Sequence, residues 1–254
     1  MNKNKFQLCD ISDQILLSLN AKPPRRISLT QQVENRLKCA LILGFLAPGQ
    51  KMITKEIAES LNMSITPVRE ALVRLSSYGA LHVSPSHAFL VPDIHPDRLI
   101  ELMGIRKMLE LPAITRSINI MSDEALNSLV ELTLELEAAH LSGDIKTAVQ
   151  LHWALRLRMF TLSDSPELMA LITQLWVSVG PSFHFLYETT SLEEWPKYYY
   201  PLRDALINRN ADLIIKIFTN SIDSGMKLYM DIHGEGWGDA VTWIHSLHVP
   251  QPKK

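Results

Sequence analysis

The chain has 254 residues, of which 46% are hydrophobic, and its formal net charge at pH 7 is −2. This composition excludes a disordered chain, and ten glycines and fourteen prolines are too few for a collagen-like one. Two cysteines, Cys9 and Cys39, cannot build a disulfide framework, and the polar N-terminus lacks the apolar core of an export signal. We therefore expect a cytoplasmic protein with no membrane-spanning segment.

The charge is divided unevenly along the chain. Residues 1–92 carry a balance of +5, whereas the remaining residues carry a balance of −7. A basic front and an acidic back indicate two domains, of which the first is suited to meet a polyanion.

The basic part begins with residues 1–27, where a short apolar stretch and a Pro-Pro-Arg-Arg step predict a mobile arm. Apolar residues at helical spacing then predict three helices. Thr54 is expected to cap the second helix, Asn62 to end it, and Ser64 to cap the third. The three predicted helices cover residues 28–43, 53–61 and 66–78.

Two extended runs, at residues 81–83 and 89–91, flank a Ser84-Pro85-Ser86-His87 turn and predict a small hairpin. Three helices followed by a hairpin are the order of a winged helix-turn-helix domain, here over residues 28–93. Such a domain seats its third helix in the major groove of DNA.

Beyond the hairpin the helical periodicity is nearly unbroken and predicts an all-α helical bundle over residues 97–231, with a loose tail over 232–254. Ser122 starts one helix, Gly143 closes it, and Gly180-Pro181 is expected to kink another. The fold class is therefore mainly α. The expected helices cover residues 97–119, 123–141, 144–161, 166–190, 194–208 and 211–230.

The outward side of the third helix carries candidate DNA-binding residues. Arg69 and Arg74 project away from its apolar stripe, and a guanidinium can donate two hydrogen bonds to one guanine edge. Lys55 in the second helix, with the hydroxyls of Ser64 and Thr66, suits phosphate groups. The alternative interpretation is a solvated cationic face on a three-helix bundle.

Several residues of this domain stand at a characteristic spacing. They are Gly44, Pro48-Gly49, Ile57-Ala58, Leu61, Ser64, the run from Thr66 to Leu72, Leu75 and Gly79. With these residues the stretch 44–81 resembles the DNA-binding domain of the GntR family of bacterial transcriptional regulators. The helical half, residues 97–230, is similar to the FadR-type (FCD) effector domain of that family. Its clearest match is the stretch from Arg106 to Glu110, and these two end residues are spaced to form an ion pair.

The resemblance implies that Lys55, Ser64, Arg69 and the wing-tip His87 contact DNA. Ile65 is a further candidate, but it stands where the family commonly has arginine, so the target sequence stays open. The resemblance also implies a homodimer that binds a palindromic operator in double-stranded DNA.

Many FCD domains hold a divalent metal ion with one aspartate and three histidines. On this sequence the four positions fall on Ala148, His152, Tyr199 and Ser221. One ligand of the four is left, so we expect no metal ion and no other cofactor.

The same positions offer a different use. His152, Tyr199 and Ser221 are predicted to line a cavity for a small organic effector, and Arg156 and Arg203 are placed to bind its carboxylate or phosphate. The alternative is that the first three are core residues and the two arginines are solvated.

These features predict a ligand-responsive, DNA-binding regulator of transcription. Two alternatives stay open: a helical half that only dimerises and binds no ligand, or a small-molecule enzyme. The sequence contains no GxSxG, P-loop, GxGxxG or HExxH motif and no cysteine–histidine nucleophile, so we expect no catalytic residue.

Overall fold

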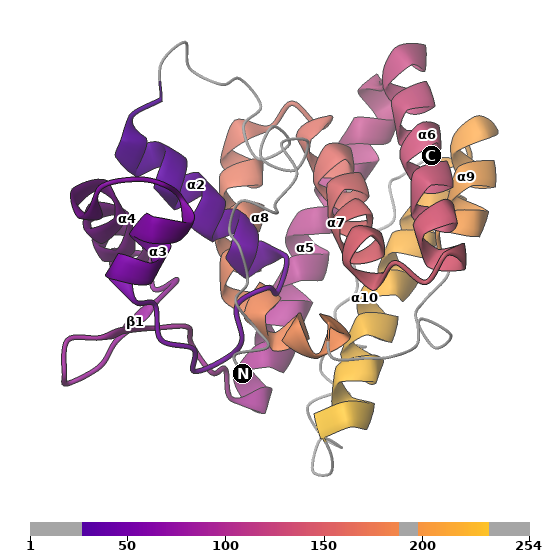
Figure 1. Ribbon diagram of the computed structural model, residues 1–254. Helices are drawn as coiled ribbons and strands as arrows, with labels where there is room; N and C mark the ends of the chain where they lie inside the picture. The colour runs from indigo at the N-terminus through magenta and orange to yellow at the C-terminus, as the bar shows by residue number, and fades with distance from the viewer. Residues whose placement is uncertain (1–26, 188–197, 234–254) are drawn as a thin grey trace. The chain divides into compact units, whose positions relative to one another are not determined.

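The computed structural model describes residues 27–187 and 198–233 (Figure 1). The predicted arm, apart from its last residue, and nearly all of the predicted tail lie outside these residues. Contacts divide the described chain into two compact units. The first unit holds residues 27–93, 145–157 and 173–187, and the second holds residues 94–144, 158–172 and 198–233. The domain boundaries expected from the sequence stay predictions.

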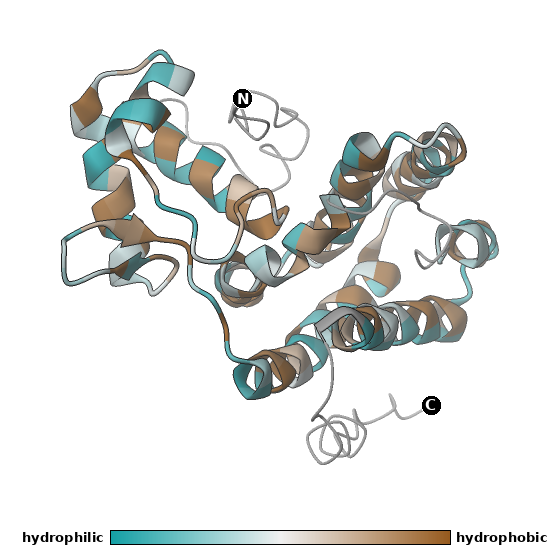
Figure 2. Ribbon diagram, turned by 60° about the horizontal axis from the view of Figure 1, so that its bottom comes forward, coloured by the Kyte–Doolittle hydropathy of each residue, from teal (hydrophilic) through white to brown (hydrophobic). Residues whose placement is uncertain are grey.

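The first unit contains the predicted winged helix-turn-helix. Its elements follow the expected order: α2 (Leu29–Ile42), α3 (Thr54–Ser60), α4 (Ile65–Ser77), β1 (His82–Val83) and β2 (Phe89–Leu90). The two strands pair antiparallel, and α2 and α3 both pack against α4. Hydrophobic and hydrophilic residues alternate along these helices, as expected for helices with one buried side (Figure 2). Cys39 is buried in this core, and burial raises the pKa of its thiol, so the thiol is unreactive.

Local sequence signals set most of the helix ends in this domain. Ser28 caps α2, because its hydroxyl oxygen accepts a hydrogen bond of 3.2 Å from the backbone N–H three residues later. Asn62, with a φ of 51°, turns the chain between α3 and α4, as predicted. The prediction for Thr54 is wrong by one residue, since the N-cap is Ile53. Ser64 is the N-cap of α4, as predicted, but its hydroxyl makes no capping bond.

Helices also make up the rest of the described chain. They are α5 (Pro96–Ile120), α6 (Asp123–Leu141), α7 (Ile145–Thr161), α8 (Pro166–Val179), the 3-10 helix η2 (Gly180–Tyr187), α9 (Tyr199–Ile207) and α10 (Ala211–His233). In the second unit α6 packs against α9, and α10 packs against α5 and α9. Ser122 caps α6 and Gly143 closes it with a φ of 73°, both as predicted. The first positions of the helix predicted over residues 194–208 lie outside the described residues.

The helix predicted over residues 166–190 is not continuous. The α-helix ends at Val179, and the chain continues as the 3-10 helix η2. Pro181 has no N–H for the α-helical ladder, which explains why the predicted kink becomes a change of helix type.

One helical stretch of the described chain, Pro166–Tyr187, is long and apolar enough to span a membrane when judged by length and composition alone. Of its most apolar window, 56% is buried inside the protein. Trp176 and Phe183 are among the buried side chains. This burial is the pattern of a core helix.

Within the first unit, the end of α2 is fastened to η2 by a contact that we call the α2–η2 clasp, made by Leu43, Gly44, Gly180, His184 and Tyr187. The hydroxyl of Tyr187 donates a hydrogen bond of 2.8 Å to the carbonyl oxygen of Leu43. Nδ1 of His184 lies 2.8 Å from the carbonyl oxygen of Gly44, and because a carbonyl only accepts, Nδ1 carries the proton. Burial raises the pKa of Tyr187, so its hydroxyl stays protonated and able to donate.

The two glycines of the clasp are required by close backbone approach. A Cβ on Gly180 would lie 2.1 Å from the carbonyl oxygen of Leu41. A Cβ on Gly44 would lie 2.8 Å from the carbonyl oxygen of Gly180, and the φ of 68° at Gly44 is itself unfavourable for other residues. Neither backbone can hold a side chain at this contact.

We expect Gly180→Ala to lower the melting temperature more than Gly49→Ala does. The alanine at 180 meets backbone atoms, whereas a Cβ on Gly49 meets nothing within 4 Å and adds only the strain of its φ of 74°, about 1–2 kcal/mol. Thermal unfolding followed by circular dichroism measures both variants. Equal shifts would contradict the close approach at Gly180.

Candidate nucleic-acid interface

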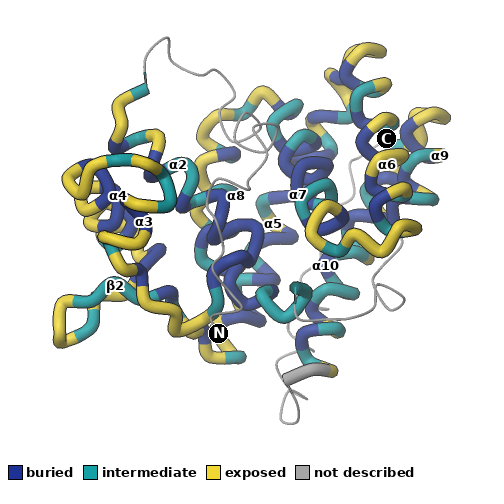
Figure 3. Tube along the Cα trace, in the orientation of Figure 1, coloured by how far each residue is buried: buried dark blue, intermediate teal, exposed yellow. Residues whose placement is uncertain are grey.

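The two sides of α4 have opposite environments. One side is buried against α2 and α3 and consists of Pro67, Val68, Ala71, Leu72 and Leu75. The other side is exposed and consists of Ile65, Thr66, Arg69, Glu70, Val73, Arg74 and Ser77. Figure 3 shows this division along α4. A helix with one fully exposed side of this length is able to enter a DNA groove.

The residues that the sequence singled out around the start of α4 are all exposed. Lys55 lies in the first turn of α3, and its exposed ammonium is 4.0 Å from the carboxylate of Glu59. Ser64 and Thr66 flank the first residue of α4. The backbone N–H groups of this first turn carry the positive end of the helix dipole, which favours a phosphate nearby.

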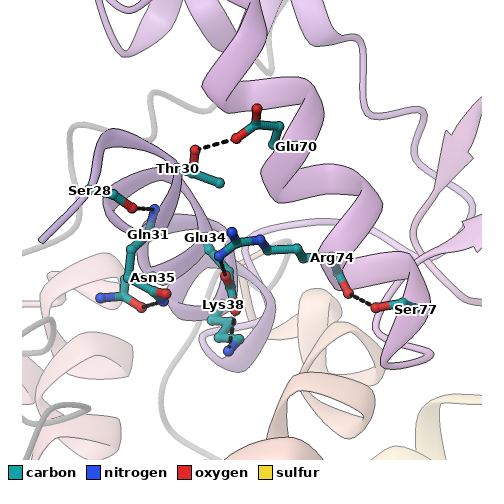
Figure 4. A network of polar contacts seen from close by, with 9 residues as sticks. All are labelled: Ser28, Thr30, Gln31, Glu34, Asn35, Lys38, Glu70, Arg74 and Ser77. Atoms are coloured by element: carbon teal, nitrogen blue, oxygen red, sulfur yellow. Dashed lines mark hydrogen bonds and ion pairs between the residues drawn. The ribbon is translucent and has the colours of Figure 1, made fainter.

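The two predicted arginines differ in their surroundings. Within the part of the chain that the structure describes, Arg69 is exposed and makes no ion pair. The guanidinium of Arg74 lies 3.6 Å from the carboxylate of Glu34 on α2. The same carboxylate lies 2.7 Å from the ammonium of Lys38 (Figure 4). Arg69 is therefore available to a ligand, whereas Arg74 ties α4 to α2.

A second polar link between the same helices holds an acidic side chain. Thr30 donates a hydrogen bond of 2.7 Å to the carboxylate of Glu70, which turns that carboxylate toward α2 (Figure 4). The sequence did not reveal these roles of Thr30, Glu34 and Glu70, because the residues that they contact across the two helices lie 40 positions away. The signal available in the sequence was an acidic residue, Glu70, beside the two arginines on the predicted outward side of the third helix.

The wing is short, and its tip is exposed. His87 has a φ of 61° at the tip, and its backbone N–H donates a hydrogen bond of 2.8 Å to the carbonyl oxygen of Ser84. The stretch from His82 to Leu90 contains no lysine or arginine. His82 and His87 are thus the basic side chains that this wing can present.

The five predicted effector residues are divided between the two units. In the first unit His152 and Arg156 lie one turn apart on α7. Arg156 is 2% exposed, and its guanidinium carbon is 5.8 Å from the centre of the Trp176 ring. His152 is half-buried against the edge of Trp153, with ring centres 5.3 Å apart.

In the second unit Tyr199 and Arg203 lie one turn apart on α9. Tyr199 is buried, and its pKa is raised, mainly because burial removes its hydroxyl from water. Its ring centre is 5.7 Å from that of His140, a neighbour that the sequence did not reveal. Arg203 is already paired, since it donates a hydrogen bond of 2.6 Å to Glu137. Ser221 on α10 donates a hydrogen bond of 2.8 Å to the carbonyl oxygen of Phe218.

The predicted ion pair of α5 is confirmed. Nε of Arg106 donates a hydrogen bond of 2.7 Å to Glu110, and both side chains are buried in the second unit. The metal prediction concerned Ala148 and three further positions. Among residues 27–187 and 198–233 no group of three or more His, Cys, Asp or Glu side chains is placed to hold a metal ion.

A winged helix-turn-helix with an exposed recognition side, joined to a helical domain, defines a DNA-binding regulator. Comparison with known proteins supports this class: the model for bacterial regulatory proteins of the gntR family matches residues 29–91, and that for the FCD domain matches residues 101–224. The chain belongs to the GntR family and carries an FCD domain, so it is a transcriptional regulator of that type.

Individual relatives agree with this assignment. The chain is 44% identical over 170 residues to the HTH-type transcriptional regulator McbR of Escherichia coli K12, covering 67% of this chain and 77% of that protein. The solved structure of E. coli McbR/YncC has a TM-score of 0.77 at 37% identity and matches 82% of this chain and 100% of that one. A GntR-type structure from Rhodococcus sp. RHA1, with a TM-score of 0.64 at 18% identity, shares the fold.

We expect Glu34→Gln to destabilise the winged helix-turn-helix by about 1–2 kcal/mol. The buried carboxylate offsets two cations, and losing it costs less than the full penalty of a buried pair because Lys38 and Arg74 are partly in water. Urea unfolding followed by helical circular dichroism measures the change. The control is Glu59→Gln, which removes an exposed pair and is expected to cost under about 0.5 kcal/mol. A larger loss for the control would refute this role of Glu34.

Proposed function

We propose that this regulator acts in the cytoplasm as a homodimer that binds a palindromic operator. A small anionic effector held in the helical domain changes the affinity of the protein for that operator. The observation that carries the DNA-binding half of the proposal is the exposed side of α4, on which Arg69 is unpaired in the described structure. A dimer with twofold symmetry matches the symmetry of a palindromic site.

Each DNA-binding candidate has a role that fits its position. Arg69, one turn into α4, donates two hydrogen bonds to a guanine edge. Lys55, Ser64 and Thr66 bind phosphates on either side of the groove, and His87 reaches the backbone from the wing. Arg74, on α4, supports this arrangement, because its ion pair with Glu34 links α4 to α2.

We expect Arg69→Ala to weaken operator binding at least tenfold, the loss of one bidentate contact, and to leave the melting temperature unchanged. Fluorescence anisotropy with a labelled operator at fixed salt measures the affinity. The matched control is Arg74→Ala, which we expect to lower stability as well as affinity. Binding at full strength by Arg69→Ala would show that α4 does not read the operator through this residue.

The effector half of the proposal rests on buried polar side chains. Arg156 is buried beside Trp176, with its guanidinium carbon 5.8 Å from the centre of that ring. An anionic group of an effector would accept hydrogen bonds from the guanidinium of Arg156 and the imidazole of His152. The three other predicted effector residues lie within the second unit, where Tyr199 and Ser221 carry hydroxyls and Arg203 would have to exchange Glu137 for a ligand.

The α2–η2 clasp supports a route from effector to DNA. Trp176, the neighbour of Arg156, lies on α8, and η2 follows α8 directly. The clasp fastens η2 to the end of α2, and α2 packs against α4. An effector changes operator affinity by this route only when it binds the two arrangements of these helices with different affinity.

A screen of small carboxylates, sugar acids and acyl thioesters tests the effector. We expect one chemical class to raise the melting temperature and to change operator affinity. The operator must then change the affinity for that compound by the same factor. Tyr199→Phe and Ser221→Ala each remove one hydroxyl and should reduce the thermal shift without lowering the melting temperature of the ligand-free protein. No stabilisation by any class would favour a helical domain that only dimerises.

A further inference from the structure

The first residue of α4 is a large aliphatic side chain that is left in water. Ile65 is 55% exposed, although its neighbours on the same side, Ser64, Thr66 and Arg69, are polar or charged. It belongs to none of the buried positions that hold α4 against α2 and α3. Single exposed aliphatic residues are common on protein surfaces, so the position of this one decides its meaning.

Local structure gives no reason for isoleucine here. A β-branched side chain is a weaker helix former than alanine or glutamate, and the first turn of a helix favours acidic or small polar residues. Isoleucine also has no hydrogen-bonding group that could cap the helix. What the residue adds is therefore exposed apolar surface at the first turn of α4.

The major groove offers one apolar group, the C5-methyl group of thymine. We propose that Ile65 packs against a thymine methyl group and thereby determines specificity at that base pair. This inference rests on the proposed reading of the operator by α4. It explains how this position selects a base without any hydrogen bond.

The spacing along α4 predicts where the thymine lies. Ile65 and Arg69 are one helical turn apart, which corresponds to about 6 Å along the helix axis. Successive base pairs are about 3.4 Å apart. The thymine is thus expected within about two base pairs of the guanine that Arg69 reads, once in each half-site of the operator.

The test removes only the methyl group. An operator is first selected with the full-length protein from random duplexes, and each thymine is then replaced in turn by deoxyuridine, symmetrically in both half-sites. Affinity is measured by fluorescence anisotropy at fixed salt for the wild type, Ile65→Ala and Ile65→Val. Val73→Ala is the control, because Val73 is 50% exposed on the same helix, two turns beyond Ile65.

For the wild type we expect one position at which deoxyuridine weakens binding about fourfold per half-site, the loss of one buried methyl group. Ile65→Ala should lose this dependence, to under about 1.5-fold, whereas Ile65→Val and Val73→Ala should keep most of it. The pattern is a double-mutant cycle between one side chain and one methyl group.

Two results would overturn the inference while the proposed function stands. In one, the wild type is insensitive to deoxyuridine at every thymine; in the other, Ile65→Ala keeps the full loss, as it would if Ile65 contacted another protein. A full-length protein that selects no duplex at all would overturn both the inference and the proposed function.

Discussion

The structure of the DNA-binding domain depends on how α4 is held against α2. An apolar stripe buries one side of α4, but a stripe of aliphatic side chains alone permits small rotations about the helix axis. Two polar contacts also link the two helices: the hydrogen bond from Thr30 to Glu70, which is directional, and the ion pair of Glu34 with Arg74. The proposed reading of DNA by α4 depends on the angle at which its outward residues meet base edges, and these contacts hold the two helices that set this angle.

The same contacts shape the electric field of the recognition side. Glu70 lies on the exposed side of α4 and would repel phosphates if its carboxylate pointed outward. Thr30 holds that carboxylate toward α2, and Glu34 is covered by Lys38 and Arg74. The carboxylates of Glu70 and Glu34 are thus both engaged within the domain, whereas Arg69 on α4 is exposed and makes no ion pair in the described residues.

The sequence predicted those features that depend on residues a few positions apart. The cap by Ser122 and the turn at Asn62 are of this kind, and so is the Arg106–Glu110 pair at a spacing of one helical turn. Features that join distant segments could not be predicted, because composition and periodicity carry no information on which helices meet. The hydrogen bond from Thr30 to Glu70 and the α2–η2 clasp belong to this second group.

The α2–η2 clasp is formed by backbone groups on one side and by side chains on the other. On the α2 side the clasp uses the backbone carbonyl oxygens of Leu43 and Gly44, so its hydrogen bonds require no side chain there. The specific side chains, His184 and Tyr187, are both on η2. Substitutions on the outward side of α4 therefore change no residue of the α2–η2 clasp. The constraint falls instead on Gly44 and Gly180, where any side chain would meet backbone atoms.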